Sequence, residues 1–223
     1  MSELPLDETT RVRRLPERQR TERAELDAVL DAAMVAHVGV VRDGQPVVIP
    51  FASARDGDGL LLHGSTGAGL LRAAAAGEPV CATVTLLDGL VVARSVFDHS
   101  MNYRSAVVLG VPEVLEGEAK ERALQVITDH LLPGRTSEVR ASTRKELAAT
   151  LVVRLPLDRA SVKVRAAPAT TAPDDGEDRG TWAGVVPLQT WAGDPQPHHD
   201  VPDGVEVPES VRAAVAATRT PRR

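Results

Sequence analysis

Apolar residues recur along the chain with two different periods. Near the N-terminus the spacing is three or four residues, which places the apolar side chains on one face of an amphipathic helix. These residues are Leu26, Val29, Leu30, Ala33 and Met34. Thr21 precedes them and is of a type that often caps a first helical turn. The pattern predicts one helix over roughly residues 21–34.

The period then shortens to that of β-strands. Valine-rich runs at 35–41 and 46–54 flank Asp43-Gly44, which is a strong short signal for a hairpin turn. A second turn, Asp56-Gly57-Asp58-Gly59, leads into a short apolar run at 60–63. Three strands joined by tight turns predict an antiparallel meander.

The rest of the chain to residue 164 reads as more strands with two further helices. Asp88-Gly89 predicts another hairpin turn. The expected elements are a helix at 70–76, strands at 80–86, 90–93 and 103–115, a helix at 118–132, and strands at 151–155 and 161–164. Six or seven short strands with few crossovers favour a closed or partly closed antiparallel barrel over a parallel doubly wound sheet.

Composition narrows the class of protein. Hydrophobic residues make up 43% of the 223 residues and aromatic residues only 2%, so the core must be mostly aliphatic. The net charge of −5 gives no general attraction to nucleic acid or to an anionic membrane. No apolar stretch is long enough to span a bilayer, and the polar start predicts no signal peptide. The single cysteine, Cys81, fits a reducing compartment, so we expect a cytoplasmic protein.

The composition also divides the chain into three segments. Residues 1–20 mix arginine with acidic residues and are interpreted as an N-terminal arm, either solvated or lying across a partner subunit. Residues 21–167 carry the predicted barrel domain. Residues 168–223 form an acidic, proline-rich extension. Within it the apolar stretch 182–188 is expected to dock back onto the barrel.

A glycine-rich turn between a strand and a helix is the first candidate site. It reads His63-Gly64-Ser65-Thr66-Gly67-Ala68-Gly69, and Arg72 follows one turn into the helix. Backbone N–H groups and hydroxyls that converge on one point suit a phosphate. The sequence is neither a P-loop nor a dinucleotide fingerprint, and the alternative is a plain connection without a ligand.

A polar stretch just before an apolar strand is the second candidate. It reads Asp98-His99-Ser100-Met101-Asn102-Tyr103-Arg104-Ser105 and holds the only tyrosine of the chain. Polar loop residues on a rigid sheet often form binding sites, although such residues can also satisfy the backbone of a turn. His198-His199-Asp200 in the acidic tail lacks further ligands in register, so no metal site is predicted.

Several of these stretches match a known family. They are the run 35–49, the turn His63-Gly64-Ser65, the segment 88–95 and above all residues 99–105. Over roughly residues 10–190 the chain resembles the pyridoxamine 5′-phosphate oxidase-like, FMN-binding split-barrel proteins, and within them the flavin-nucleotide-binding branch related to the nitroimidazole-resistance proteins. The resemblance implies a mainly β (α+β) fold, a six-stranded antiparallel split β-barrel with peripheral helices, in a homodimer with FMN at the subunit interface.

The resemblance also implies roles for particular residues. Val48, Ile49 and Pro50 would lie along the isoalloxazine ring. His63, Gly64, Ser65 and Thr66, with Arg72, would hold the ribityl phosphate, and Asn102, Arg104 and Ser105 would line the same cleft. Two features depart from the family pattern. Gly67-Ala68-Gly69 stands where many relatives carry Arg or Lys, and the C-terminus lacks the Arg-x-His clamp of the vitamin B6 oxidases.

These implications predict an FMN-binding oxidoreductase that acts on a small, nitro- or heteroaromatic substrate. A two-electron reduction needs a nearby proton source, and His99 and Tyr103 are the candidates for that catalytic role. One alternative is a non-catalytic flavin- or small-ligand-binding dimer that serves as a sensor or carrier. Another is a haem-binding split barrel with His63 or His99 as the axial ligand.

Overall fold

The computed structural model describes residues 2–170 and 180–219, and antiparallel strands dominate them. The strands are β1 (Gln19–Arg20), β2 (Val35–Arg42), β3 (Gln45–Asp56), β4 (Gly59–Ser65), β5 (Val80–Val92), β6 (Ser100–Gly110), β7 (Glu113–Val114), β8 (Thr150–Pro156), β9 (Ala160–Arg165) and β10 (Gly184–Pro187). The α-helices are α1 (Arg23–Ala32), α2 (Gly69–Ala75), α3 (Gly117–Leu131), α4 (Arg144–Ala149) and α5 (Glu209–Arg219).

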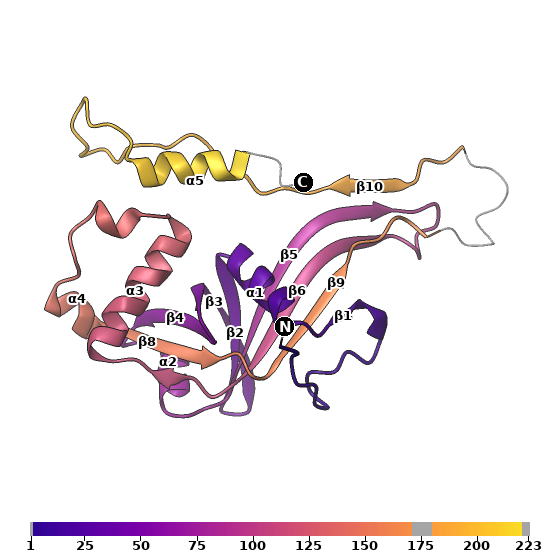
Figure 1. Ribbon diagram of the computed structural model, residues 1–223, viewed down its shortest axis with the longest axis horizontal. Coiled ribbons are helices and arrows are strands. Elements are labelled where there is room, and N and C mark those ends of the chain that lie inside the picture. Colours follow the sequence, from indigo (N-terminus) through magenta and orange to yellow (C-terminus); the bar gives the residue numbers. More distant parts are fainter. Residues whose placement is uncertain (1, 171–179, 220–223) are drawn as a thin grey trace.

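The strands form one strongly bent sheet in the order β1-β9-β6-β5-β2-β3-β4-β8-β7, and β10 pairs with β5 off this path. In Figure 1 the strands β5, β6 and β9 run out to one side, while β4 and β8 cross below α3 and complete the barrel. The mainly β, split-barrel fold class predicted from the sequence is confirmed. The described chain has ten strands, of which β1, β7 and β10 are short additions to the sheet. The seven that remain are one more than the six strands that the resemblance implies.

The core is aliphatic, as the composition predicts. Its fully buried side chains include Leu26, Val38, Leu62, Leu71 and Leu155, and Phe51 packs against them only partly buried. In β2 buried and outward residues alternate, as expected for a strand with one face on the core. At the hairpin after it, Asp43 and Gly44 both have positive φ, of 50° and 74°. A tight two-residue hairpin turn requires that geometry.

The hairpin predicted at Asp88-Gly89 is wrong. Strand β5 continues through these residues to Val92, with only a shift of register against β6 between Leu87 and Gly89. Glycine is needed at position 89 because β10 packs closely against it. A methyl group there would lie 3.1 Å from both the Val185 side chain and the Val186 carbonyl oxygen of β10. The glycine therefore permits a close approach of backbone rather than a turn.

The N-terminal residues are attached to their own chain at several points, although most of them are exposed. Leu4 and Thr10 are buried, with 5% and 1% of their surface exposed. Residues Gln19–Arg20 pair with β9, and the Leu4 N–H donates to the Thr21 carbonyl oxygen. This segment packs on its own chain. Several elements were not predicted, among them β1, α4 and, in the C-terminal extension, α5.

Candidate cofactor site

The predicted isoalloxazine strand and the glycine-rich turn are neighbours in the structure. Strand β3 pairs with β4 through Ser53 and Leu62, so the residues before Ser53 on β3 run alongside the end of β4. A methyl group on Gly64 would lie 3.6 Å from the Phe51 ring and 2.7 Å from the Leu71 side chain. Close packing at Gly64 therefore joins β3, β4 and α2.

An apolar strip is exposed next to this junction. Val48 and Ile49 expose 62% and 40% of their surface, and Pro50 is exposed as well. Such a strip of β-branched and proline side chains suits contact with a planar ring. Because successive side chains of a strand point to opposite faces, Val48 and Pro50 lie on one face of β3 and Ile49 on the other. Their roles beside a flavin stay a prediction.

The backbone of the glycine-rich turn is largely engaged within the chain. The Thr66 N–H donates to the Ala149 carbonyl oxygen at 3.0 Å and the Ala68 N–H to the Ser65 carbonyl oxygen at 2.9 Å. The Gly67 N–H donates to Ser65 Oγ at 3.1 Å. Three of the donors that the sequence offered to a phosphate are therefore already used. Arg72 is exposed on α2, and its role stays a prediction.

His63 lies on β4, opposite Val152 of β8. Its Nδ1 is buried and has no hydrogen-bond partner among residues 2–170 and 180–219. Burial lowers the pKa of the imidazole below its ordinary value of 6.5, so the ring is neutral near pH 7. A buried nitrogen without a partner is unfavourable, and a neutral imidazole is the form that binds transition metals. The residue is therefore suited to a ligand role.

The second cluster lies on β6 and is held by hydrogen bonds of the sheet. The Arg104 guanidinium donates from Nε and Nη2 to the two carboxylate oxygens of Asp88, at 3.0 and 2.7 Å. The carboxylate raises the pKa of Arg104. Asn102 Oδ1 accepts from Arg165 and from the Ala167 N–H, and Ser105 Oγ donates to the Lys163 carbonyl oxygen at 3.3 Å. These contacts fix β5, β6 and β9 against one another.

The two residues predicted for proton transfer lie near this cluster. Tyr103 is half-buried on β6, where it pairs with Leu87 of β5 and Arg165 of β9. His99 is exposed in the turn before β6, and its Nδ1 lies 2.7 Å from the Ser95 carbonyl oxygen. That contact fits an N–H donated by Nδ1, which would leave Nε2 as the acceptor or ligand atom.

Within one chain, the glycine-rich turn and the cluster at residues 102–105 lie on strands that are not neighbours in the sheet. The strands β5, β2 and β3 lie between β6 and β4. Residues 102–105 sit on the part of β6 that runs out beside β5 and β9 (Figure 1).

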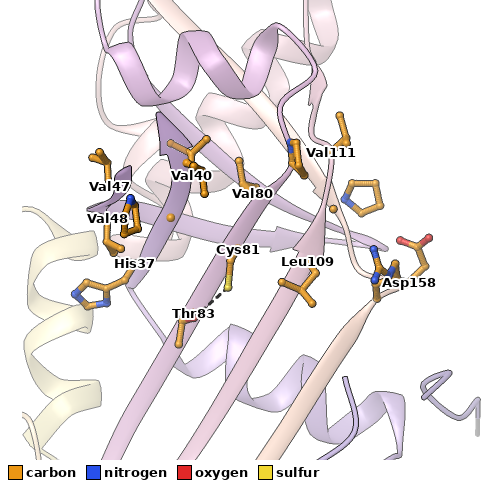
Figure 2. Close-up of a pocket in the computed structure, with 17 residues that line it drawn as sticks. His37, Val40, Val47, Val48, Val80, Cys81, Thr83, Leu109, Val111 and Asp158 are labelled. Carbon is orange, nitrogen blue, oxygen red and sulfur yellow. Dashed lines mark hydrogen bonds between the residues drawn. The ribbon is translucent and has the colours of Figure 1, made fainter. Parts of the chain in front are cut away.

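An apolar trough with a volume of about 870 Å³ lies on the outer face of the sheet. Figure 2 shows valines of β2, β3 and β5 on one side of it and Leu109 and Asp158 on the other. His37 opens onto it, and Cys81 Sγ lies 3.8 Å from Thr83 Oγ1. The wall includes Val47 and Val48 but none of residues 63–66. Sequence analysis missed the trough, although the outward positions Val35, His37, Gly39 and Val41 held the signal.

The described residues hold no group of three or more His, Cys, Asp or Glu side chains that could bind a metal ion. The histidines of the tail contact each other and Asp200 instead: the rings of His198 and His199 lie 4.1 Å apart, and His198 Nδ1 is hydrogen-bonded to Asp200. Among helices of the described ranges, none has the length and apolar character needed to cross a bilayer.

Comparison with known proteins gives a family and two long relatives. The sequence model of the pyridoxamine 5′-phosphate oxidase family matches residues 22–164. The chain is 48% identical to the FAD and haem binding protein from Mycobacterium smegmatis, covers 89% of its own length and 97% of that chain, and superposes with a TM-score of 0.85. It is 35% identical to the flavocytochrome Anf3 from Azotobacter vinelandii, with 93% and 97% covered and a TM-score of 0.86.

A more distant structure shares the fold alone. It is a protein from Bacteroides thetaiotaomicron assigned to 5-nitroimidazole antibiotic resistance, 24% identical, with a TM-score of 0.55. The match covers 66% of this chain and 86% of that one. No curated protein matches the chain.

Proposed function

Because the chain belongs to the pyridoxamine 5′-phosphate oxidase family, we propose that it is a flavin-binding redox protein that also binds haem. The observation that carries this proposal is the likeness to the mycobacterial FAD and haem binding protein. Nearly half of the aligned residues are identical over almost the whole of that protein. The second long relative is named as a flavocytochrome, so both cofactors are represented there too.

The flavin ring would lie on the exposed strip Val48–Pro50, with its phosphate end toward the turn at Ser65 and Thr66. FMN is the flavin expected from the sequence. FAD is supported by the likeness to the mycobacterial relative, which is named as an FAD and haem binding protein. We therefore take FAD as the flavin and FMN as its alternative, and the mass of the flavin released by heat distinguishes them.

His63 is the residue that best fits haem iron. Burial keeps its ring neutral, and no hydrogen bond in the described part of the chain occupies either ring nitrogen. His99 is the second candidate, since its Nδ1 contact to a carbonyl leaves Nε2 available. Bound haem and flavin would supply one-electron and two-electron chemistry, respectively. His99 and Tyr103 are proposed to deliver protons to a small planar substrate, such as a nitro- or heteroaromatic compound.

A homodimer is part of this proposal. Outward side chains of the sheet are apolar and exposed, among them Val35, Val41 and Val48 at 44%, 65% and 62%. Phe97, at the tip between β5 and β6, is 93% exposed. Apolar surface of this extent is typical of an interface. In a two-fold dimer the Asn102–Ser105 cluster of one copy would meet the turn of the other, and sedimentation of the purified protein measures the oligomeric state.

The test uses the full-length protein supplied with FAD and haemin. The proposal expects a flavin absorption that bleaches under anaerobic reduction and returns when a nitroaromatic acceptor is added. It also expects a Soret band that is lost in His63→Ala and kept in the matched variant His99→Ala. Loss in His99→Ala alone would move the axial ligand to His99. A flavin that resists every reductant would make the protein a carrier, and uptake of neither cofactor would refute the proposal.

A further inference from the structure

The glycine-rich turn has too little to hold a phosphate by itself. None of residues 64–69 is basic, and the N–H groups of Thr66, Gly67 and Ala68 all donate to oxygens of the same chain. Hydrogen bonds assisted by a charge are about twice as strong as neutral ones. A flavin phosphate bound at this turn therefore needs a cation from another part of the fold.

Arg42 is placed to be that cation. It is the last residue of β2, immediately before the Asp43-Gly44 turn, and it lies far from the glycine-rich turn in sequence. Its guanidinium nevertheless lies against Gly69. A methyl group on Gly69 would be 2.7 Å from Nη1, 3.4 Å from Cζ and 3.7 Å from Nη2. Gly69 does not have the positive φ that would otherwise call for glycine, so its lack of a side chain serves to admit the guanidinium.

The guanidinium is also uncommitted. Arg42 is exposed, and its guanidinium has no hydrogen bond or ion pair with any residue of the described ranges 2–170 and 180–219. By contrast, Arg104 of the second cluster is already paired with Asp88 through two hydrogen bonds. An arginine is charged at every relevant pH, and its planar fork of donors matches phosphate oxygens. The Arg42 guanidinium, which lies beside the uncharged glycine-rich turn, is therefore available to bind an anion.

We propose that Arg42 binds the phosphate of the flavin and takes the place of the basic residues that relatives carry at positions 67–69. The inference rests on the proposed function, since it concerns the same flavin. It assigns the two halves of phosphate binding to different elements: hydroxyls come from the turn at Ser65 and Thr66, and the positive charge comes from β2. Gly69 acts as a positioning residue because it leaves room for the guanidinium.

Three flavins separate this role from a structural one, and two of them, riboflavin and FMN, differ in the phosphate alone. Riboflavin has no phosphate, FMN has one and FAD has a pyrophosphate, and quenching of flavin fluorescence gives the dissociation constant of each. Arg42→Gln is expected to weaken FMN and FAD binding by about tenfold or more, the range for losing a charged hydrogen bond. Riboflavin binding should not change. Because Arg42 is exposed, the thermal unfolding temperature should be kept.

Two further variants sharpen the test. Arg72→Gln removes the exposed arginine of α2 that the sequence assigned to the same phosphate, so the two variants decide which arginine supplies the charge. The inference expects the larger loss of FMN binding in Arg42→Gln. Gly69→Ala is expected to weaken FMN and FAD in the same direction as Arg42→Gln, because the new methyl group must displace the guanidinium. Higher salt should reduce the difference between wild type and Arg42→Gln.

The outcomes are distinguishable from failure of the function itself. If the wild type binds FMN or FAD and Arg42→Gln binds them equally well, the inference is wrong and the function stands. If Arg42→Gln weakens riboflavin binding as much as FMN binding, the role of Arg42 is structural. If Arg72→Gln instead weakens FMN binding, Arg72 of α2 supplies the charge for the phosphate. If the wild type binds none of the three flavins, the proposed function fails first and the role of Arg42 falls with it.

Discussion

The barrel and the C-terminal strap, which we define as residues 180–219, are held together in opposite ways. The barrel buries its aliphatic side chains almost completely, with Leu26, Leu71 and Leu155 at 0% exposure. The strap leaves Trp182 and Trp191 exposed at 62% and 76%. Figure 1 shows it running above the sheet from β10 to α5. The barrel is therefore stabilised by its core, whereas the strap depends on a few local contacts.

Contacts with the rest of the chain attach the strap near both of its ends. At one end β10 pairs with residues 89–92 of β5. At the other, the Glu138 carboxylate accepts hydrogen bonds from the Ser210 N–H and hydroxyl at the start of α5. The chain between these points exposes most of its side chains.

The comparison separates what the family shares from what it does not. The family match ends at residue 164. The two long relatives cover 89% and 93% of this chain, so their likeness extends into the region beyond that residue. The more distant nitroimidazole-resistance fold covers only 66%. The barrel is thus the common fold of the family, and the likeness beyond residue 164 is found with the FAD and haem binding protein and with the flavocytochrome.

The largest effect is expected from the barrel core. Leu71→Ala should lower the free energy of unfolding by about 2–5 kcal/mol, the usual cost of deleting a buried leucine side chain. Leu71 is fully buried and packs beside Gly64, so the variant also loosens the candidate site. In the strap, Trp191→Ala should change the same free energy by less than about 0.5 kcal/mol. Urea unfolding of the two variants measures the contrast, and equal losses would contradict it.

A smaller effect is expected where the strap meets β5. Gly89→Ala places a methyl group 3.1 Å from the Val186 carbonyl oxygen, and such overpacking costs about 1–3 kcal/mol. We expect hydrogen exchange to speed up at Gly184–Pro187 while the barrel stays protected. Gly193→Ala, elsewhere in the strap, has nothing within 4 Å of its added methyl group and serves as the matched control. Exchange that rises throughout the barrel would show that the strap is not a separate unit.

The pH dependence of the barrel should reflect His63. Burial lowers the pKa of its imidazole below 6.5, so the unfolded chain binds this proton more readily than the folded one. The stability from His63 is therefore complete above pH 6.5 and declines as the pH falls through the lower pKa of the folded state. His63→Gln should flatten this decline between about pH 8 and 5, whereas His99→Gln should not. Parallel curves of stability against pH for wild type and His63→Gln would contradict this role of His63.

The smallest effect is expected at the attachment of α5. The hydrogen bonds from Ser210 lower the pKa of Glu138 below its ordinary 4.5. The contact is therefore complete above pH 4.5 and is lost as the pH falls through the lower folded-state pKa. Ser210→Ala should speed exchange at the start of α5 at neutral pH without moving the thermal unfolding temperature. A global loss of stability would mean that α5 is integral to the barrel.

Local sequence patterns predicted most of the strands and helices correctly, but they predicted one turn that the structure does not have. Alternation at 35–41 and the Asp43-Gly44 signal predicted β2, β3 and their hairpin, because both depend on residues that are adjacent in sequence. Asp88-Gly89 carries the same signal but lies inside β5, since its glycine admits β10 from a segment almost a hundred residues later. Helix α5 also went unpredicted in a stretch whose acidic and proline-rich surroundings favoured a loop.

The candidate site was predictable in its residues but not in its contacts. The sequence singled out His63 and the turn that follows it, because histidine, hydroxyls and glycines stand together there. It could not show that the N–H groups of the turn bond within the chain, nor that Arg42 reaches Gly69. Both facts depend on packing between β2, β4, α2 and α4, and no spacing within a single segment records such packing.

The central claim is that this barrel holds a flavin, and the most direct measurement is the absorption of the purified protein between about 350 and 500 nm, where flavins and haem absorb. The spectrum should be followed by identification of whatever cofactor is released. The account predicts a yellow protein that yields FAD or FMN, or that becomes yellow when either is added and keeps the colour through gel filtration. A colourless chain that retains neither flavin after such loading would contradict it.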